Sequence, residues 1–168
     1  MNFFTEKRKL KYLWISFAVF FVDFISKYYV VKYFEKNTFL SYISVIGNFF
    51  RIKYVKNYGA AFSFKIGNNL EFNRYFFITV VFVACFFIIY LLLTSQKKIH
   101  FFAYTMILGG AIGNLFDRIK YGYVIDFLDF DFPDILMERW AVFNIADSFI
   151  VIAIMLLFFE NIFYKKKN

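Results

Sequence analysis

The sequence predicts an all-α integral membrane protein with four transmembrane helices, and two observations predict it. Of the 168 residues, 61% are hydrophobic and only 19% are charged, so the chain has too little polar surface for a soluble domain of this size. Apolar runs also recur at about the 20-residue length that a helix needs to cross the hydrocarbon core. We therefore expect one membrane domain that covers residues 1–168.

The four expected spans differ in how many charges they contain. The second has none, whereas the first contains Asp23 and Lys27 and the fourth contains Asp147 and Glu160. These internal charges, and the lack of a small-residue cleavage site, disfavour a cleaved signal peptide at the first span. The expected spans are residues 12–33, 75–94, 101–118 and 140–163.

Three dense basic clusters flank these spans and predict the orientation of the chain. They lie at residues 7–11, 97–98 and 165–167. Four spans place all three on one side, which the positive-inside rule makes cytoplasmic. The basic residues on the other side are spread over two longer segments and interleaved with acids, so they are weaker evidence for the orientation of the chain. Both termini are expected in the cytoplasm, and contact with anionic lipid explains the net charge of +8 without a nucleic-acid partner.

The first outer segment, about residues 35–74, predicts a small extracytoplasmic β-sheet. Its stretch "NFFRIKYVKN" alternates in part and is rich in aromatic and β-branched residues. Gly59 follows, where a turn or a close backbone approach suits a glycine.

Neither cysteine nor histidine predicts a metal site. The single cysteine, Cys85, lies in the middle of an apolar span, where it is expected to pack as a small side chain. The single histidine, His100, has no cysteine or histidine near it in the sequence. We expect no metal and no cofactor.

Charged side chains within spans usually face the protein interior and mark function, because they are costly in the bilayer. Asp23 and Lys27 are four residues apart and can neutralise each other on one helix face. Two interpretations stay open: a buried ion pair that fixes the first span, or direct substrate contact. In the third span, Asn114 and Asp117 share a polar stripe, and Asp117 and Arg118 can pair or anchor the membrane interface.

Two aspartates near the outer boundary form the best candidate for a catalytic pair. Asp147 shares a helix face with Asn144, about two turns inside that boundary. Asp126 has apolar neighbours on both sides, which suits a site of low dielectric constant. Two such carboxyl groups can activate water and protonate a leaving group without a metal. Three other aspartates are expected in a loop that solvent reaches: Asp129, Asp131 and Asp134.

Peptide hydrolysis is the chemistry that this pair serves best, and two other functions stay open. A small proton-coupled carrier could use Asp23, Asp117 and Asp147 as a relay, although the internal repeats expected of a carrier are not detected. A non-enzymatic assembly subunit could use the close helix contact that Gly109 and Gly113 permit. Such a subunit has no reason to place asparagine and aspartate on the same inward faces.

Four blocks of the sequence closely resemble the bacterial lipoprotein signal peptidases, the signal peptidase II family. The blocks are "DFISK", "NYGAAFS", "GGAIGNLFDRIKYGYVIDF" and "FNIADS", and they occur in the family's order within a matching four-span layout. The first block departs from the family, because Phe24 stands where a glutamine is more usual.

The resemblance implies an aspartyl endopeptidase of the bacterial inner membrane, with no cofactor. It implies that the substrates are diacylglyceryl-modified prolipoproteins, which are cut just before the lipidated cysteine. The active site would lie near the outer face of the membrane, in contact with membrane lipid. We expect a monomer. The outer sheet would form a cradle over the substrate, and a short helical element after it would form a lid. By motif position, the catalytic pair would be Asp126 and Asp147. The substrate-binding residues would be Asn57, Asn114, Arg118 and Asn144. The structural polar residues would be Asp23, Lys27 and Asp117.

Overall fold

Four long helices make up most of the structure, a computed structural model that describes residues 11–59, 66–131 and 140–165. They are α2 (Leu13–Lys36), α3 (Leu70–Thr94), α4 (Lys98–Tyr121) and α5 (Ile145–Lys165). In the described part of the chain, these four helices are the ones long and apolar enough to cross a membrane. The predicted four-helix membrane fold is confirmed.

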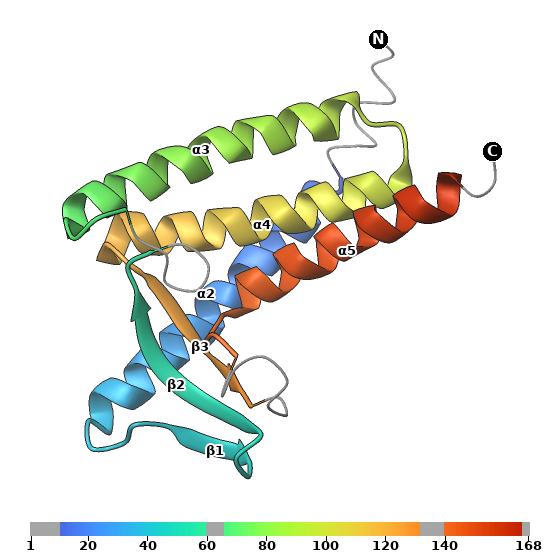
Figure 1. Cartoon of the computed structure of the whole chain (residues 1–168). Helices are drawn as coiled ribbons and strands as arrows, with labels where there is room; N and C mark the ends of the chain where they lie inside the picture. The colour runs from blue at the N-terminus through green and yellow to red at the C-terminus, as the bar shows by residue number, and fades with distance from the viewer. Residues whose placement is uncertain (1–10, 60–65, 132–139, 166–168) are drawn as a thin grey trace.

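Helix α4 is the centre of the bundle and packs against α2, α3 and α5 (Figure 1). Small residues permit this close packing. A Cβ atom at Gly109 would lie 2.5 Å from the Ser16 carbonyl oxygen of α2, and one at Gly110 would lie 2.7 Å from the Ala146 carbonyl oxygen of α5. Glycine at these positions therefore holds α4 against both neighbours at once.

Large apolar side chains cover the outside of the bundle. On α3, Phe82, Phe86, Phe87 and Tyr90 are all more than half exposed. Such a surface would be unstable in water and suits the hydrocarbon of a bilayer. Cys85 is buried between these exposed neighbours, as expected of a packing residue.

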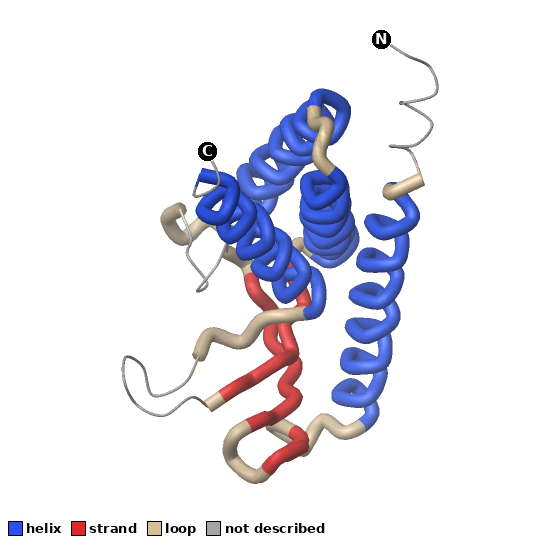
Figure 2. Tube along the Cα trace, turned by 90° about the vertical axis from the view of Figure 1, so that its right-hand side faces the viewer, coloured by secondary structure: helices blue, strands red, loops and turns tan. Residues whose placement is uncertain are grey.

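A three-stranded antiparallel sheet lies at one end of the bundle, beside α2, as Figures 1 and 2 show. Its strands are β1 (Ile43–Ile46), β2 (Phe50–Asn57) and β3 (Val124–Phe130), in the order β1-β2-β3. The predicted sheet is confirmed, and β3 is an addition to it, because strands were expected only within about residues 35–74. The predicted lid would follow β2, and residues 60–65 lie outside the described residues.

The edge of β3 away from β2 pairs with the segment that leads into α5. Phe143 and Leu128 exchange backbone hydrogen bonds of 2.8 and 3.1 Å, as an isolated antiparallel bridge. This pairing explains why the fourth helix begins at Ile145 and not at residue 140 as predicted, since the preceding residues are extended. β3 thus lies between two partners, and the start of α5 is fixed beside it.

The other helices are longer than the predicted spans. α3 begins at Leu70, five residues before the predicted start, because the Asn69 side chain caps it by accepting a hydrogen bond of 3.0 Å from the Phe72 amide. α4 ends at Tyr121, where Gly122 adopts a φ of 83°. That left-handed conformation stops the helix at low cost and turns the chain directly into β3.

Candidate active site

Asp126 lies in the middle of β3 and is buried, with 2% of its surface exposed. It is opposite Val55 of β2. The Asn57 side chain of β2 donates a hydrogen bond of 2.9 Å to Asp126 Oδ2. The Asn144 side chain donates one of 2.7 Å to Asp126 Oδ1. Both carboxyl oxygens therefore face amide donors from other segments of the chain.

Asp147 lies in the first turn of α5, and a local sequence motif holds it there. The Asn144 side-chain oxygen accepts a hydrogen bond of 2.9 Å from the Asp147 amide, and Asp147 Oδ2 accepts one of 3.3 Å from the Asn144 amide. This reciprocal pattern is that of a capping box, in which residues three apart satisfy each other's backbone donors at a helix start. The sequence "NIAD" therefore begins the helix and orients its carboxylate together.

Two asparagines join the two aspartates into one network. Asn114 of α4 donates a hydrogen bond of 2.8 Å to Asp147 Oδ1. Its own oxygen accepts one of 3.1 Å from Asn144 Nδ2, the nitrogen that also donates to Asp126. Asn144 thus contacts both carboxyl groups and Asn114, and it is completely buried.

The surroundings of Asp126 favour its protonated form. Burial, and after it the negative charge of Asp147, raise the pKa of Asp126 to about 7, against the lowering effect of the hydrogen bonds from Asn57 and Asn144. A carboxyl group with such a pKa can hold a proton near neutral pH and release it to a substrate. Two adjacent carboxyl groups with one proton between them are suited to acid–base chemistry.

The three residues expected to be structural form a buried cluster behind this network. Lys27 Nζ lies 2.7 Å from Asp23 Oδ2 and 2.8 Å from Asp117 Oδ2, so the Asp23–Lys27 pair predicted from their spacing is present. Asp23 also accepts from the Ala146 amide, and Asp117 from the Ile125 amide. The ion partner of Asp117 is thus Lys27, rather than the adjacent arginine that the sequence suggested.

Arg118 ties α4 to the end of β2. Its guanidinium donates a hydrogen bond of 2.8 Å to the Gly59 carbonyl oxygen and one of 3.3 Å to the Asn114 carbonyl oxygen. The guanidinium also lies 5.6 Å from the centre of the Phe77 ring of α3. It therefore joins three elements at the same end of the bundle as the two aspartates.

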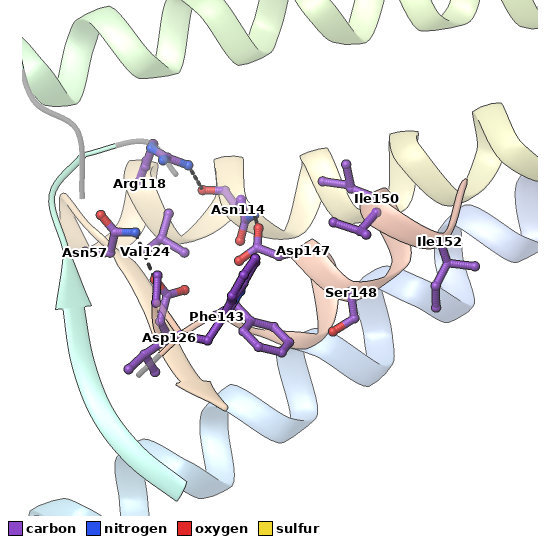
Figure 3. Close-up of a pocket in the computed structure, with 14 residues that line it drawn as sticks. Asn57, Asn114, Arg118, Val124, Asp126, Phe143, Asp147, Ser148, Ile150 and Ile152 are labelled. Carbon is purple, nitrogen blue, oxygen red and sulfur yellow. Dashed lines mark hydrogen bonds between the residues drawn. The ribbon is translucent and has the colours of Figure 1, made fainter. Parts of the chain in front are cut away.

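A cavity of about 520 Å³ opens beside both aspartates (Figure 3). One end is polar and the other is apolar. The polar lining is formed by Asn57, Asn114, Arg118, Asp126, Asp147 and Ser148. The apolar lining includes Trp140, Val142, Phe143, Ile150, Val151 and Ile152. Of the expected substrate-binding residues, Asn57, Asn114 and Arg118 line the cavity, whereas Asn144 lies behind its wall. Asp23, Lys27 and Asp117 are not among the lining residues.

Sequence reasoning missed two features of this site. The expectation that solvent reaches Asp129 is wrong, because this residue is 1% exposed and pairs with Lys53 at 2.7 Å. Both faces of β3 are covered by other parts of the protein, so consecutive residues from Val124 to Phe127 are all buried and exposure does not alternate along the strand. The apolar wall was also missed, because Val142 and Phe143 were assigned to a helix. The extended pairing of Phe143 with β3 turns this segment toward the cavity.

Comparison with known proteins assigns the family. The family model described as "Signal peptidase (SPase) II" matches residues 15–163. The lipoprotein signal peptidase of Haemophilus ducreyi is 39% identical over 166 residues, which cover 98% of each chain. That of Psychromonas ingrahamii is 39% identical over 96% of this chain and 90% of its own. The corresponding Francisella tularensis protein is 36% identical over 95% of this chain and 96% of its own.

Two solved structures share the fold. Both are described as bacterial membrane enzymes solved by the in meso method. One superposes with a TM-score of 0.78 at 24% identity, covering 94% of this chain and 91% of its own, and therefore supports the fold alone. The other has a TM-score of 0.73 at 25% identity, over 89% of this chain and 91% of its own. From its sequence blocks, its four apolar helices and these matches, the chain is a multi-pass membrane protein that belongs to the signal peptidase II family.

Proposed function

We propose that this protein is an aspartyl endopeptidase that removes the signal peptide from diacylglyceryl-modified prolipoproteins, cutting just before the lipidated cysteine. Asp126 and Asp147, together the dyad, are its catalytic residues. The observation that carries the proposal is that Asn144 contacts both carboxyl groups, with a hydrogen bond of 2.7 Å to Asp126 and one of 3.3 Å to Asp147. The names of the relatives, lipoprotein signal peptidases, support the substrate class.

In the proposed reaction, Asp147 acts as the base and Asp126 as the acid. Asp147 takes a proton from a water molecule, whose oxygen attacks the carbonyl carbon of the scissile peptide bond. Asp126 gives its proton to the carbonyl oxygen, which stabilises the tetrahedral intermediate. When the intermediate collapses, the C–N bond breaks, the Asp147 proton passes to the leaving amine, and the hydroxyl proton returns to Asp126.

The lining of the cavity supports this choice of substrate. Its apolar wall suits a lipidated peptide, and Trp140 is half exposed beside it. Amphipathic tryptophans favour the boundary between lipid and water. Asn57 and Arg118 at the polar end can bind the peptide backbone of the substrate near the dyad. Asn144 is completely buried and does not line the cavity, so its effect on the substrate is through the dyad and not by direct contact.

We also propose that the sheet and the dyad face the outside of the cytoplasmic membrane, with both termini in the cytoplasm. The basic residue Lys97 lies in the link between α3 and α4, and Lys98 begins α4, at the end of the bundle remote from the sheet (Figure 1). The positive-inside rule favours the cytoplasm for that end.

Cleavage of a synthetic prolipoprotein peptide by the purified protein in detergent tests the proposed function. We expect the diacylglyceryl-modified peptide to be cut between the lipidated cysteine and the residue before it, as mass spectrometry of the two products would show. The same peptide with an unmodified cysteine is the matched control and should be cut far more slowly. Equal cleavage of both peptides, or cleavage of neither, would contradict the proposal.

A further inference from the structure

We propose that Lys27 is a positioning residue for the dyad, in addition to its role in a buried ion-pair cluster: it sets the direction of the Asn114 amide and thereby makes Asp147 the hydrogen-bond acceptor. This inference rests on the proposed peptidase function. Lys27 lies on α2, 2% exposed, and is not among the residues that line the cavity. It acts on the dyad through Asn114.

The three N–H bonds of the Lys27 ammonium match three oxygen acceptors. They are Asp23 Oδ2 at 2.7 Å, Asp117 Oδ2 at 2.8 Å and Asn114 Oδ1 at 3.0 Å. A lysine ammonium has donors and no acceptor. If the Asn114 side chain were reversed, its NH₂ group would face the ammonium, donor against donor. Lys27 therefore holds the Asn114 oxygen toward α2, together with Asn144 Nδ2, which donates to the same oxygen at 3.1 Å.

The opposite side of the same amide faces the dyad. With its oxygen toward Lys27, Asn114 presents Nδ2 to Asp147 Oδ1 at 2.8 Å. The other Asp147 oxygen faces the Asn144 amide at 3.3 Å. Both oxygens of Asp147 thus accept hydrogen bonds, which orient the carboxyl group that the proposed reaction uses as its base. The direction of the Asn114 amide decides the first of these two contacts.

The positive charge of Lys27 also reaches Asp126 and lowers its pKa, against the larger raising effects of burial and of Asp147. The other charged groups around Asp126 come from the elements packed against it. Asp147 of α5 and Arg118 of α4 interact with Asp126 directly. Asp23 of α2 and Asp117 of α4 pair with Lys27, and the Lys53–Asp129 pair belongs to the opposite face of β3. Loss of the Lys27 charge should therefore raise the pKa of Asp126 and move the alkaline limb of the pH–rate profile to higher pH.

Four variants test this role by kcat, KM and pH–rate profile. Lys27→Met removes both donor and charge. Lys27→Met combined with Asp23→Asn removes one positive and one negative charge and so keeps the net charge of the cluster, in case the single variant does not fold. Lys27→Arg keeps a positively charged side chain that donates hydrogen bonds and accepts none. Lys53→Met is the matched control, because it also leaves a buried aspartate, Asp129, without its lysine.

We expect kcat to fall about a hundredfold in both Met variants of Lys27, the size of effect that misplacement of a reacting group produces, with little change in KM. The alkaline limb should move to higher pH in Lys27→Met, and Lys27→Arg should recover part of kcat. Lys53→Met should lose stability but keep the wild-type profile. A folded charge-balanced variant with the wild-type kcat and profile would overturn the inference.

An infrared titration of the protonated carboxyl groups separates this inference from the proposed function, because it needs no substrate. We expect Lys27→Met to shift the titration to higher pH relative to Lys53→Met and to the wild type. An unchanged titration would overturn the role of Lys27 even in an active enzyme. Failure of the wild type to cut the lipidated peptide would instead overturn the proposed function.

Discussion

The two ends of the helix bundle each carry a polar cluster, and the two clusters differ in burial. At the end remote from the sheet, Glu160 of α5 pairs with Lys97 at 2.6 Å and with His100 at 3.2 Å. The Lys97 side chain there is 41% exposed. At the sheet end, Lys27 and Asp126 are each 2% exposed, and their partners come from α2, α4, α5 and β2.

This difference indicates which cluster carries chemistry. An accessible ion pair is screened by solvent and contributes little to stability. A buried charge loses its hydration and persists only when hydrogen bonds and opposite charges compensate it. The cluster at the sheet end meets this requirement with contacts between residues as distant in sequence as Asp23 and Ala146. The chain therefore maintains an arrangement there that stability alone does not favour.

Replacement of either dyad carboxyl group should show the largest difference in activity between the two ends of the bundle. We expect Asp126→Asn and Asp147→Asn each to lower kcat/KM at least about a thousandfold, since each removes an acid–base group from the reaction. Glu160→Gln, the matched control at the other end, should keep nearly the wild-type value in the same peptide cleavage assay. A comparable loss in Glu160→Gln would mean that the two ends do not differ in function.

Asn144→Ala should have the next largest effect. It removes the side chain that donates to Asp126 and Asn114 and caps α5, while both carboxyl groups stay in place. We expect kcat to fall about a hundredfold and stability to fall by about 1 to 2 kcal/mol from loss of the cap. Kinetics and thermal unfolding of the same preparation would measure both effects. A loss of stability with an unchanged kcat would show that Asn144 only caps α5 and does not act on the dyad.

The pH dependence of the wild type should report the burial of Asp126. Its pKa is raised to about 7, so an enzyme that needs this group protonated loses its acid as the pH rises above that value. We expect kcat/KM to fall about tenfold per pH unit on the alkaline side. The pH–rate profile of the peptide cleavage measures this, and a profile flat to pH 9 would assign the proton to another group.

The unfolding free energy should also depend on the titration of Asp126, with a smaller effect than on activity. Because folding raises the pKa of Asp126 from 3.8 to about 7, its contribution to stability is complete below about pH 4 and is lost as the pH rises through 7. Asp126→Asn does not titrate. Between pH 5 and pH 8 its unfolding free energy should therefore rise by about 2 to 3 kcal/mol relative to the wild type. Thermal unfolding in detergent at the two pH values measures this, and a constant difference would contradict the shift.

The sequence predicted the components of the site better than their contacts. The spacing of Asn144 and Asp147 predicted that the two lie together on one helix face; they are in contact, but Asn144 precedes α5 and caps it. Apolar neighbours in the sequence singled out Asp126. These features already proposed Asp126 and Asp147 as a pair, and the family resemblance implied the same two residues. Contacts across the chain were not predictable, because hydrophobic periodicity describes each segment separately. The bond from Lys27 to Asn114, 87 positions apart, depends on the glycine-mediated approach of α2 and α4.

β3 shows why the remaining differences arose. A strand that is covered on both faces loses the alternation of buried and exposed residues, so Asp129 was predicted to be a loop acid and is instead buried beside Lys53. The segment before α5 is apolar enough to extend the helix. Its backbone bonds with Leu128 instead keep it extended, because tertiary pairing overrides local propensity.

The central claim is that Asp126 and Asp147 act as one catalytic unit, and a double-mutant cycle tests it most directly. Cleavage of the diacylglyceryl-modified peptide would be measured for the wild type, Asp126→Asn, Asp147→Asn and the double variant. Groups that act as a unit show strongly non-additive losses, so we predict that the double variant is nearly as active as the less active single variant. Losses that multiply in the double variant, or full activity in either single variant, would contradict the account.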